Sequence, residues 1–303
     1  MFTLTATHLN QLCAANEFPI DRSAMVFLGL RGCLPVNPGD HEFRAQQDLV
    51  AANTDNVHPR CTLVQWLPSR RKFAVYPGST VPHRKYVDAS AAQGGAGANQ
   101  LLTGFFVDFR KGVHRSGKPT GHQAFCQTNN RPYRRTANDA IYATDDRVEM
   151  ENPGDNLHAG WCTGVDAEDF ASAGCQVLVG FPACSQRAGQ LSVGPWRAFH
   201  DAAYALAQQS FGYALLGGLE AQRVALAGNG KMERVRFGSE GARARRVQEG
   251  LKRAGHYEGE VEGKFGLRSL RALLAFQEAT FGPRGDDGIC GPQTAEALDV
   301  AWP

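Results

Sequence analysis

A histidine and a cysteine near the middle of the chain have the types and the spacing that nucleophilic catalysis requires. His158 follows an apolar residue, Leu157, and Cys175 lies 17 positions later, directly after Gly174. A thiol attacks a carbonyl group only when a neighbour takes or stabilises its proton, and histidine is the usual neighbour. The sequence therefore predicts that Cys175 attacks an amide and that His158 is its base.

The residues directly before this cysteine suit the approach of a substrate. Ala173 and Gly174 are small, so the sulfur and the nearby backbone N–H groups are accessible. The N–H groups of Gly174 and Cys175 can then form an oxyanion hole. Ser172 is not in a Gly-x-Ser-x-Gly elbow, so its hydroxyl is expected to position the turn rather than to act as the nucleophile. We include Ser172 and Gly174 among the catalytic-site residues.

These two segments resemble the L,D-transpeptidase catalytic domain, which has the YkuD fold. That family carries an apolar-His-Gly segment and, after a similar interval, the segment Ser-His-Gly-Cys-x-Arg. The corresponding residues here are Ser172, Ala173, Gly174, Cys175 and Gln176. The resemblance implies a Cys175 nucleophile, a His158 base and backbone oxyanion donors at Gly174 and Cys175. Ala173 replaces the family's second histidine and Gln176 its arginine, which leaves open how a substrate carboxylate is held.

Further residues near these segments are candidates for binding the substrate or aligning the base. His122, Trp161 and Gln176 are the substrate-binding candidates, and His114 is a second histidine that can line the same cleft. Asp155 and Asn156 directly precede the histidine segment, so either can orient the His158 ring, although a backbone carbonyl usually does this in the resembled family. For His114, His122 and Trp161, a role in the core is the alternative.

The C-terminal region changes from about Val235 to a pattern of short helices separated by glycine turns. Ser239 can cap the first helix and Gly255 can end it. The region resembles the PG_binding_1 family of peptidoglycan-binding domains in the segments Gly238-Ser239-Glu240-Gly241, Val247-Gln248-x-x-Leu251, Gly255-x-Tyr257-x-Gly259, Gly263-x-Phe265-Gly266, Ala275-Phe276-Gln277 and Asp287-Gly288-Ile289-x-Gly291-Pro292-x-Thr294. The resemblance implies a three-helix domain that anchors the chain to cell-wall peptides or glycan. A module for stability or oligomerisation is the alternative.

The length of 303 residues suits two domains. We predict an α+β protein with a mainly β catalytic domain over residues 1–230, carrying peripheral helices, and a small all-α domain over residues 235–303. The pattern of apolar residues predicts helices at 7–18 and 195–208, and strands at 24–30, 61–66, 72–76, 175–181 and 211–216. The strands at 61–66 and 72–76 are expected to form a hairpin.

Composition and charge exclude several classes of function. Hydrophobic residues make up 43% of the chain, charged residues 20%, and the net charge is +2, so we expect no nucleic-acid partner. No apolar run approaches the ~20 residues of a membrane span. Met1–Glu17 lacks the features of a signal peptide. We therefore expect a protein made in the cytoplasm that reaches the periplasm or cell wall by lysis or by a secretion machine.

Cysteine and histidine spacing gives no standard metal site. The eight cysteines include no C-x-x-C pair, so buried thiols are expected, with a Cys162–Cys184 bridge as an open alternative. His158, Cys162, Cys175 and Cys184 are zinc-type ligands without a tight zinc spacing. We expect no metal and no cofactor, and keep a zinc-dependent amidase or peptidase as the chemical alternative.

Together these features predict a cysteine enzyme that acts on peptidoglycan stem peptides through an acyl-enzyme on Cys175. The reaction would be L,D-carboxypeptidase or endopeptidase cleavage, or L,D-transpeptidase exchange. The expected biological role is an antibacterial effector or a phage lysin, with an immunity protein or a secretion-system component as a further partner. The alternative from another class is a non-catalytic cell-wall-binding protein.

Overall fold

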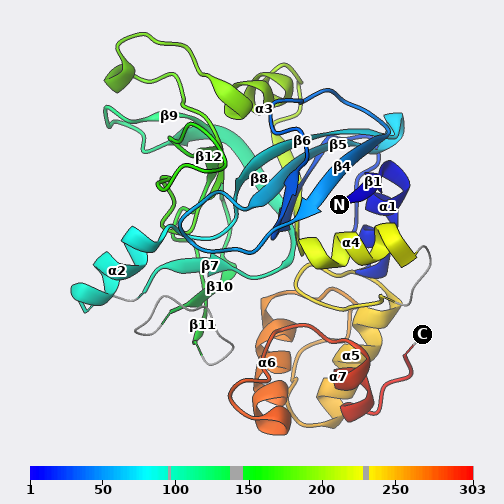
Figure 1. Cartoon of the computed structure of the whole chain (residues 1–303). Coiled ribbons are helices and arrows are strands. Elements are labelled where there is room, and N and C mark those ends of the chain that lie inside the picture. The colour runs from blue at the N-terminus through cyan, green and yellow to red at the C-terminus, as the bar shows by residue number, and fades with distance from the viewer. Residues whose placement is uncertain (95–96, 137–145, 228–231, 303) are drawn as a thin grey trace.

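A closed barrel is the centre of the N-terminal domain (Figure 1). The computed structural model describes residues 1–94, 97–136, 146–227 and 232–302. Around the barrel the strands follow the order β12 (Leu157–Ala159), β13 (Gln176–Leu178), β6 (Lys72–Ser79), β5 (Cys61–Leu67), β2 (Val26–Arg31), β14 (Ser210–Gly217), β8 (Gly104–His114) and β9 (His122–Cys126). The predicted hairpin is confirmed as the antiparallel pair β5–β6, which a 3₁₀ turn at Pro68–Arg70 connects.

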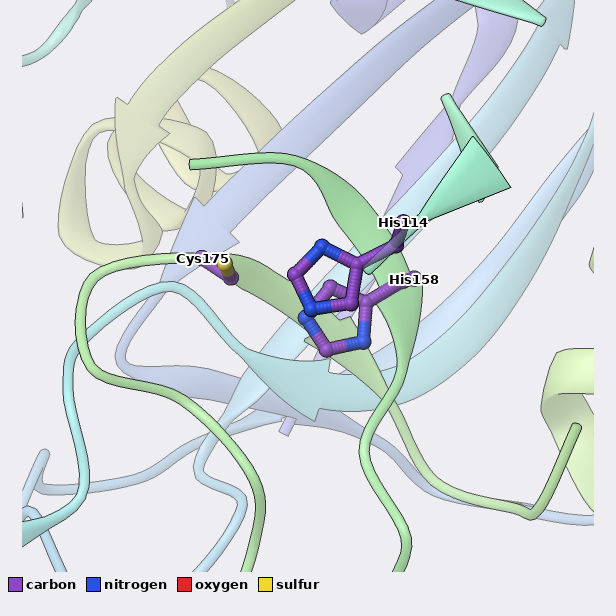
Figure 2. A group of neighbouring side chains, drawn as sticks. All are labelled: His114, His158 and Cys175. Carbon is purple, nitrogen blue, oxygen red and sulfur yellow. The ribbon is translucent and has the colours of Figure 1, made fainter. Parts of the chain in front are cut away.

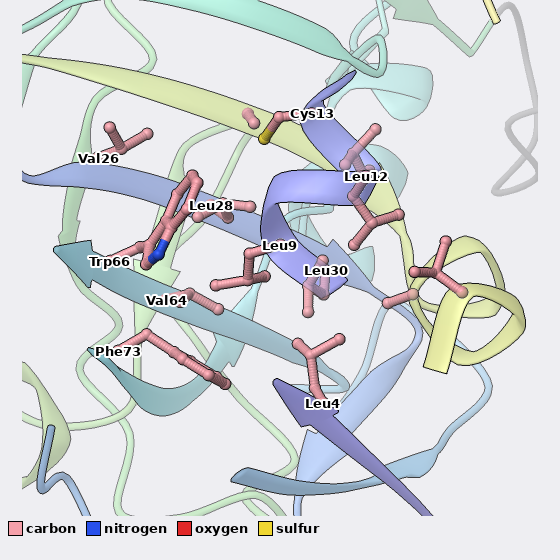
Figure 3. Packing of buried hydrophobic residues seen from close by; sticks show 14 of the residues in the cluster. Leu4, Leu9, Leu12, Cys13, Val26, Leu28, Leu30, Val64, Trp66 and Phe73 are labelled. Carbon is pink, nitrogen blue, oxygen red and sulfur yellow. The ribbon is translucent and has the colours of Figure 1, made fainter. Parts of the chain in front are cut away.

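The side chains of β2 alternate between two buried cores, which explains why this strand is apolar throughout. Leu28 and Leu30 pack outside the barrel beneath helix α1 (Ala6–Ala15), next to Leu9 (Figure 3). Phe27 points to the interior, where it contacts Phe125 of β9 across the barrel, with ring centroids 5.0 Å apart. A strand that is buried on both faces has no polar side for solvent, so polar alternation is absent from its sequence.

Two smaller antiparallel sheets and several helices surround the barrel. One sheet has the order β1 (Phe2–Thr5), β4 (Gln46–Ala51) and β3 (Cys33–Pro35), and the other has β11 (Val148–Glu151), β10 (Arg131–Arg135) and β7 (Asn99–Leu101). The peripheral helices are α2 (Arg84–Ala92), α3 (Gly194–Tyr204) and α4 (Gly218–Ala227). The predicted α+β class, with a mainly β N-terminal domain, is confirmed.

The boundaries of several predicted elements differ from the structure. The helix predicted at 7–18 is α1, and it ends at Ala15. The strand predicted at 175–181 is only the three residues of β13, so Cys175 lies just before the strand. Helix α4 was not predicted, because it begins at Gly218 and glycine more often ends a helix than begins one. Glycine there has a packing role, since a Cβ on Gly218 would lie 2.9 Å from the backbone of Gly32.

The C-terminal region contains the three predicted helices, α5 (Ala242–Arg253), α6 (Leu267–Phe281) and α7 (Pro292–Ala297). Their apolar faces share one buried cluster that includes Val247, Leu251, Leu270 and Leu273. Figure 1 shows this region beside α1 and α4 of the N-terminal domain.

Helices α1 and α5 cap each other across the boundary between the two regions. The Glu17 carboxylate accepts hydrogen bonds from the backbone N–H groups of Arg243 (3.0 Å) and Ala244 (2.9 Å) at the start of α5. The Arg243 guanidinium donates in return to the carbonyls of Ala14 and Ala15 at the end of α1. The prediction that Ser239 caps α5 is wrong, because its hydroxyl donates to the Asn16 carbonyl instead (2.6 Å).

A buried ion pair adds to the same boundary. The Arg236 side chain is fully buried, and its two terminal nitrogens donate to the two carboxylate oxygens of Glu220 in α4 at 3.2 and 3.0 Å. It also donates to the Thr103 hydroxyl at 3.0 Å. The C-terminal helical region is therefore docked through fixed polar contacts.

Among the described residues, no helix combines the length and apolar character that a bilayer crossing requires.

Glu17→Ala is expected to lower the free energy of unfolding of the full chain by about 0.5–2 kcal/mol, the usual effect of losing a helix N-cap. Alanine removes both acceptors at the start of α5, and no side chain of α5 itself caps that end. Urea unfolding followed by circular dichroism measures the change. Glu249→Ala, at an exposed position of α5, is the control, and equal stability of the two variants would contradict the capping role.

Candidate functional site

Closure of the barrel brings the predicted histidine and cysteine together. Strand β12 pairs in parallel with β13, with His158 opposite Val177, and Cys175 lies at the entry to β13. Both residues reach a pocket of about 380 Å³. Its lining consists of Tyr86, His114, Arg115, Thr120, Pro153, Gly154, Asp155, His158, Trp161, Ala171, Ala173 and Cys175.

The His158 ring is held as a neutral base. Its Nδ1 lies 2.8 Å from the Ala159 carbonyl oxygen, which can only accept, so Nδ1 carries the hydrogen and Nε2 has the free lone pair. Nε2 is buried and has no hydrogen-bond partner among the described residues. Burial, and next the neighbouring His114 and His122, lower the pKa of His158 well below its ordinary value. A buried lone pair without a partner is suited to accept a proton.

The Cys175 sulfur lies near the His158 ring without a hydrogen bond to it, and it faces a different neighbour. Its Sγ is 3.6 Å from Asp155 Oδ1, and it lies within 4.8 Å of a ring nitrogen of His158 and of His114 (Figure 2). Burial and then the Asp155 charge raise the pKa of Cys175 well above its ordinary value. Cys175 is therefore a thiol rather than a thiolate, and any attack by its sulfur requires the loss of its proton.

Ser172 and Gly174 shape the turn that carries the thiol. The Ser172 hydroxyl donates to the Cys175 carbonyl at 2.7 Å and accepts from the Gly174 N–H at 3.3 Å, so it positions the turn and does not line the pocket. Gly174 has φ +153°, and a Cβ there would lie 2.3 Å from Asp155 Oδ2. Only glycine allows this close approach.

The three predicted substrate-binding residues lie in different places. Trp161 lines the pocket. His122 is 4% exposed and lies beside His158 and Trp161, with ring centroids 5.4 and 6.0 Å apart, but it is not part of the lining. Gln176 is turned into the barrel, where it accepts from the Tyr213 hydroxyl at 2.8 Å and donates to the Gly174 carbonyl at 3.2 Å. The geometry therefore gives Gln176 a structural role.

The sequence suggested that Asp155 or Asn156 orients the His158 ring, but in the structure both side chains contact other partners. Asp155 reaches the thiol, and its other oxygen accepts from Asn99 at 2.8 Å. Asn156 donates to His114, whose ring stacks on that of His158 with centroids 4.0 Å apart. The position of Asp155 and Asn156 next to His158 in the sequence indicated that they belong to the site. Nothing in the sequence indicated that Asn99 contacts Asp155.

The pocket contains one cation and a set of metal-type donors. Among the described residues of its lining, Arg115 is the single Lys or Arg side chain. His114, His158 and Cys175 offer donor atoms of the kinds that zinc uses. The ligands of the zinc alternative do not all meet, since Cys162 and Cys184 are outside this group. All eight cysteines lie in the described part of the chain as free thiols, so the Cys162–Cys184 bridge is not formed.

Comparison with known proteins supports the C-terminal assignment. Residues 240–298 match the PG_binding_1 family of peptidoglycan-binding domains. This region is therefore a peptidoglycan-binding domain, as its motifs predicted. No curated protein and no solved structure matches the chain.

Alkylation of Cys175 by iodoacetamide is expected to be slow at pH 7 and to accelerate as the pH rises, because the pKa of this thiol is raised. Asp155→Asn should speed alkylation at pH 7 several-fold, since it removes a negative charge that opposes the thiolate. Peptide mass spectrometry measures the rate at Cys175. A rate that is already maximal at pH 7 in the unmodified protein would contradict a neutral thiol.

Proposed function

We propose that this protein is a cysteine enzyme that acts on peptidoglycan stem peptides. The single observation that carries the proposal is the buried His158 Nε2 lone pair beside the Cys175 thiol at a pocket. The chain that bears this pair also bears a peptidoglycan-binding domain at residues 240–298. An attached wall-binding domain raises the local concentration of wall substrate around the pocket.

The proposed reaction begins when the Cys175 side chain turns from Asp155 toward His158. The sulfur attacks the scissile carbonyl carbon, and the thiol proton passes to His158 Nε2. The tetrahedral intermediate then expels the amine, which leaves with that proton, and an acyl-enzyme remains on Cys175. The hydrogen bond from His158 Nδ1–H to the Ala159 carbonyl keeps the ring in the required tautomer throughout.

The second half of the reaction decides the type of enzyme. Water that attacks the acyl-enzyme gives an L,D-carboxypeptidase or endopeptidase, whereas an amine acceptor gives L,D-transpeptidase exchange. Muropeptide products of these reactions have different masses, so mass spectrometry separates them.

The Arg115 guanidinium provides a positive charge that can bind the carboxylate of a stem peptide. The resembled family has an arginine where this chain has Gln176, and Gln176 is turned into the barrel. Arg115 lines the pocket directly after His114, and no ion pair with a described residue neutralises it. We infer that Arg115 binds a substrate carboxylate at the pocket entrance.

An enzyme with this substrate acts in the periplasm or on the cell wall. The roles of antibacterial effector or phage lysin, and a partner from an immunity or secretion system, stay predictions from the sequence.

Cys175→Ala is expected to reduce product formation from purified muropeptides at least about 10³-fold, because it removes the nucleophile. Cys13→Ala, which changes a buried thiol of α1 outside the pocket, is the matched control and should retain activity. Mass spectrometry of the muropeptides is the measurement. Unchanged products from the Cys175 variant would reject the cysteine mechanism and favour a different chemistry.

Arg115→Ala is expected to raise KM about tenfold for muropeptides with a free terminal carboxylate, the effect of losing roughly one charged hydrogen bond. Arg115→Lys should retain part of the affinity because it keeps the charge. Initial rates on tetrapeptides with a free or an amidated terminus measure this effect. An equal change in KM for both substrates would show that Arg115 does not bind the terminal carboxylate.

A further inference from the structure

The amide of Asn156 fixes which nitrogen of His114 carries the hydrogen. Asn156 Oδ1 accepts the backbone N–H of Gln127 at 2.9 Å, which identifies this oxygen without ambiguity. The amide nitrogen therefore faces His114 Nδ1, at 3.0 Å. An amide NH₂ group only donates, so Nδ1 must accept, and the neutral ring carries its hydrogen on Nε2.

The Nε2–H group of His114 is available to a ligand. His114 is half-buried, it lines the pocket with His158 and Cys175, and no described residue accepts a hydrogen bond from its Nε2. Figure 2 shows the stacked His114 and His158 rings beside Cys175. Burial, the adjacent His122 and Arg115 lower the pKa of His114 to about 4, so the ring is neutral at pH 7.

The backbone near Cys175 provides fewer oxyanion donors than the sequence suggested. The Gly174 N–H already donates to the Ser172 hydroxyl at 3.3 Å. The Cys175 N–H has no oxygen acceptor among the described residues. A tetrahedral intermediate with one backbone donor requires a further donor from the pocket wall.

We propose that His114 is a catalytic residue whose Nε2–H donates to the substrate carbonyl oxygen, and that Asn156 is the positioning residue that sets its tautomer. This inference rests on the proposed function. As the bond from Cys175 Sγ to the carbonyl carbon forms, the C=O π pair moves to the oxygen and the thiol proton moves to His158 Nε2. The negative oxygen then accepts from His114 Nε2–H and the Cys175 N–H. The C=O bond re-forms when the amine leaves with the proton from His158.

The same tautomer argues against a metal at this cluster. A metal ligand must present a lone pair, and His114 Nε2 presents a hydrogen while the Asn156 amide donates to Nδ1. The cluster therefore offers the lone pair of His158, the thiol of Cys175 and the N–H group of His114. This set suits a carbonyl group better than a zinc ion, because a zinc ion would need a lone pair from each ligand.

Asn156→Asp tests the inference because it reverses the tautomer. The carboxylate still accepts from the Gln127 N–H, but its second oxygen also accepts, so the His114 hydrogen moves to Nδ1 and Nε2 gains a lone pair. We expect kcat on muropeptides to fall about 10²–10³-fold, as for the loss of one oxyanion donor, with little change in KM. His114→Ala should have a similar effect, and His114→Gln, which keeps an N–H donor, should recover part of the rate. His41→Gln, a half-buried histidine outside the pocket, is the control.

Two readouts do not depend on activity. Long-range ¹⁵N–¹H NMR should show His114 protonated on Nε2 in the unmodified protein and on Nδ1 in Asn156→Asp. Zinc titration against a chromophoric chelator should show tighter binding by Asn156→Asp than by the unmodified protein. The inference is overturned if the unmodified protein carries the hydrogen on Nδ1, or if His114→Ala keeps full kcat while Cys175→Ala loses it. Absence of any Cys175-dependent product would instead reject the proposed function, and the NMR result would still decide the tautomer.

Discussion

The parallel pairing of β12 with β13 is the constraint on which the candidate site depends. It is only three residues long, yet it closes the barrel and places the His158 strand beside the turn that carries Cys175. Backbone hydrogen bonds extend it at both ends, from Gln176 to Asn156 (2.9 Å) and from Gly160 to Leu178 (2.6 Å). The connecting segment returns to the same edge, where Ala171 donates to Gly160 at 2.7 Å. Two side chains far apart in sequence are thus held by backbone contacts rather than by each other.

Burial sets the electrostatic state of the whole site. It lowers the pKa of His158 and raises that of Cys175, so both groups are neutral. A thiolate–imidazolium pair would be unfavourable here, because Asp155 lies beside the sulfur and the other imidazoles lie beside His158. A neutral pair avoids both costs, and in the proposed reaction the proton would leave the sulfur as it attacks.

The sequence allowed the fold class, the three C-terminal helices and the His158–Cys175 pair to be predicted, because each has a local signal. Apolar periodicity and glycine turns mark the helices, and the spacing of the two reactive residues marks the pair. His114 was already a candidate from the sequence, but Asn99 and Arg115 could not be placed. They come near the Cys175 turn only through contacts between segments far apart in the chain. Gln176 was predicted to contact substrate because it directly follows the cysteine. In the structure its side chain points into the barrel and accepts a hydrogen bond from Tyr213.

The reciprocal caps between α1 and α5 and the buried pair Arg236–Glu220 hold the wall-binding domain in one pose relative to the barrel. A domain on a long flexible linker searches a volume set by linker length. Here polar contacts fix the position of the wall-binding domain relative to the pocket. In an enzyme of the proposed kind, the pocket of a wall-bound molecule would therefore reach only those peptide bonds that lie at one fixed distance from the bound site. Progress along the polymer would then require detachment, so fast release from the wall would favour turnover more than tight attachment.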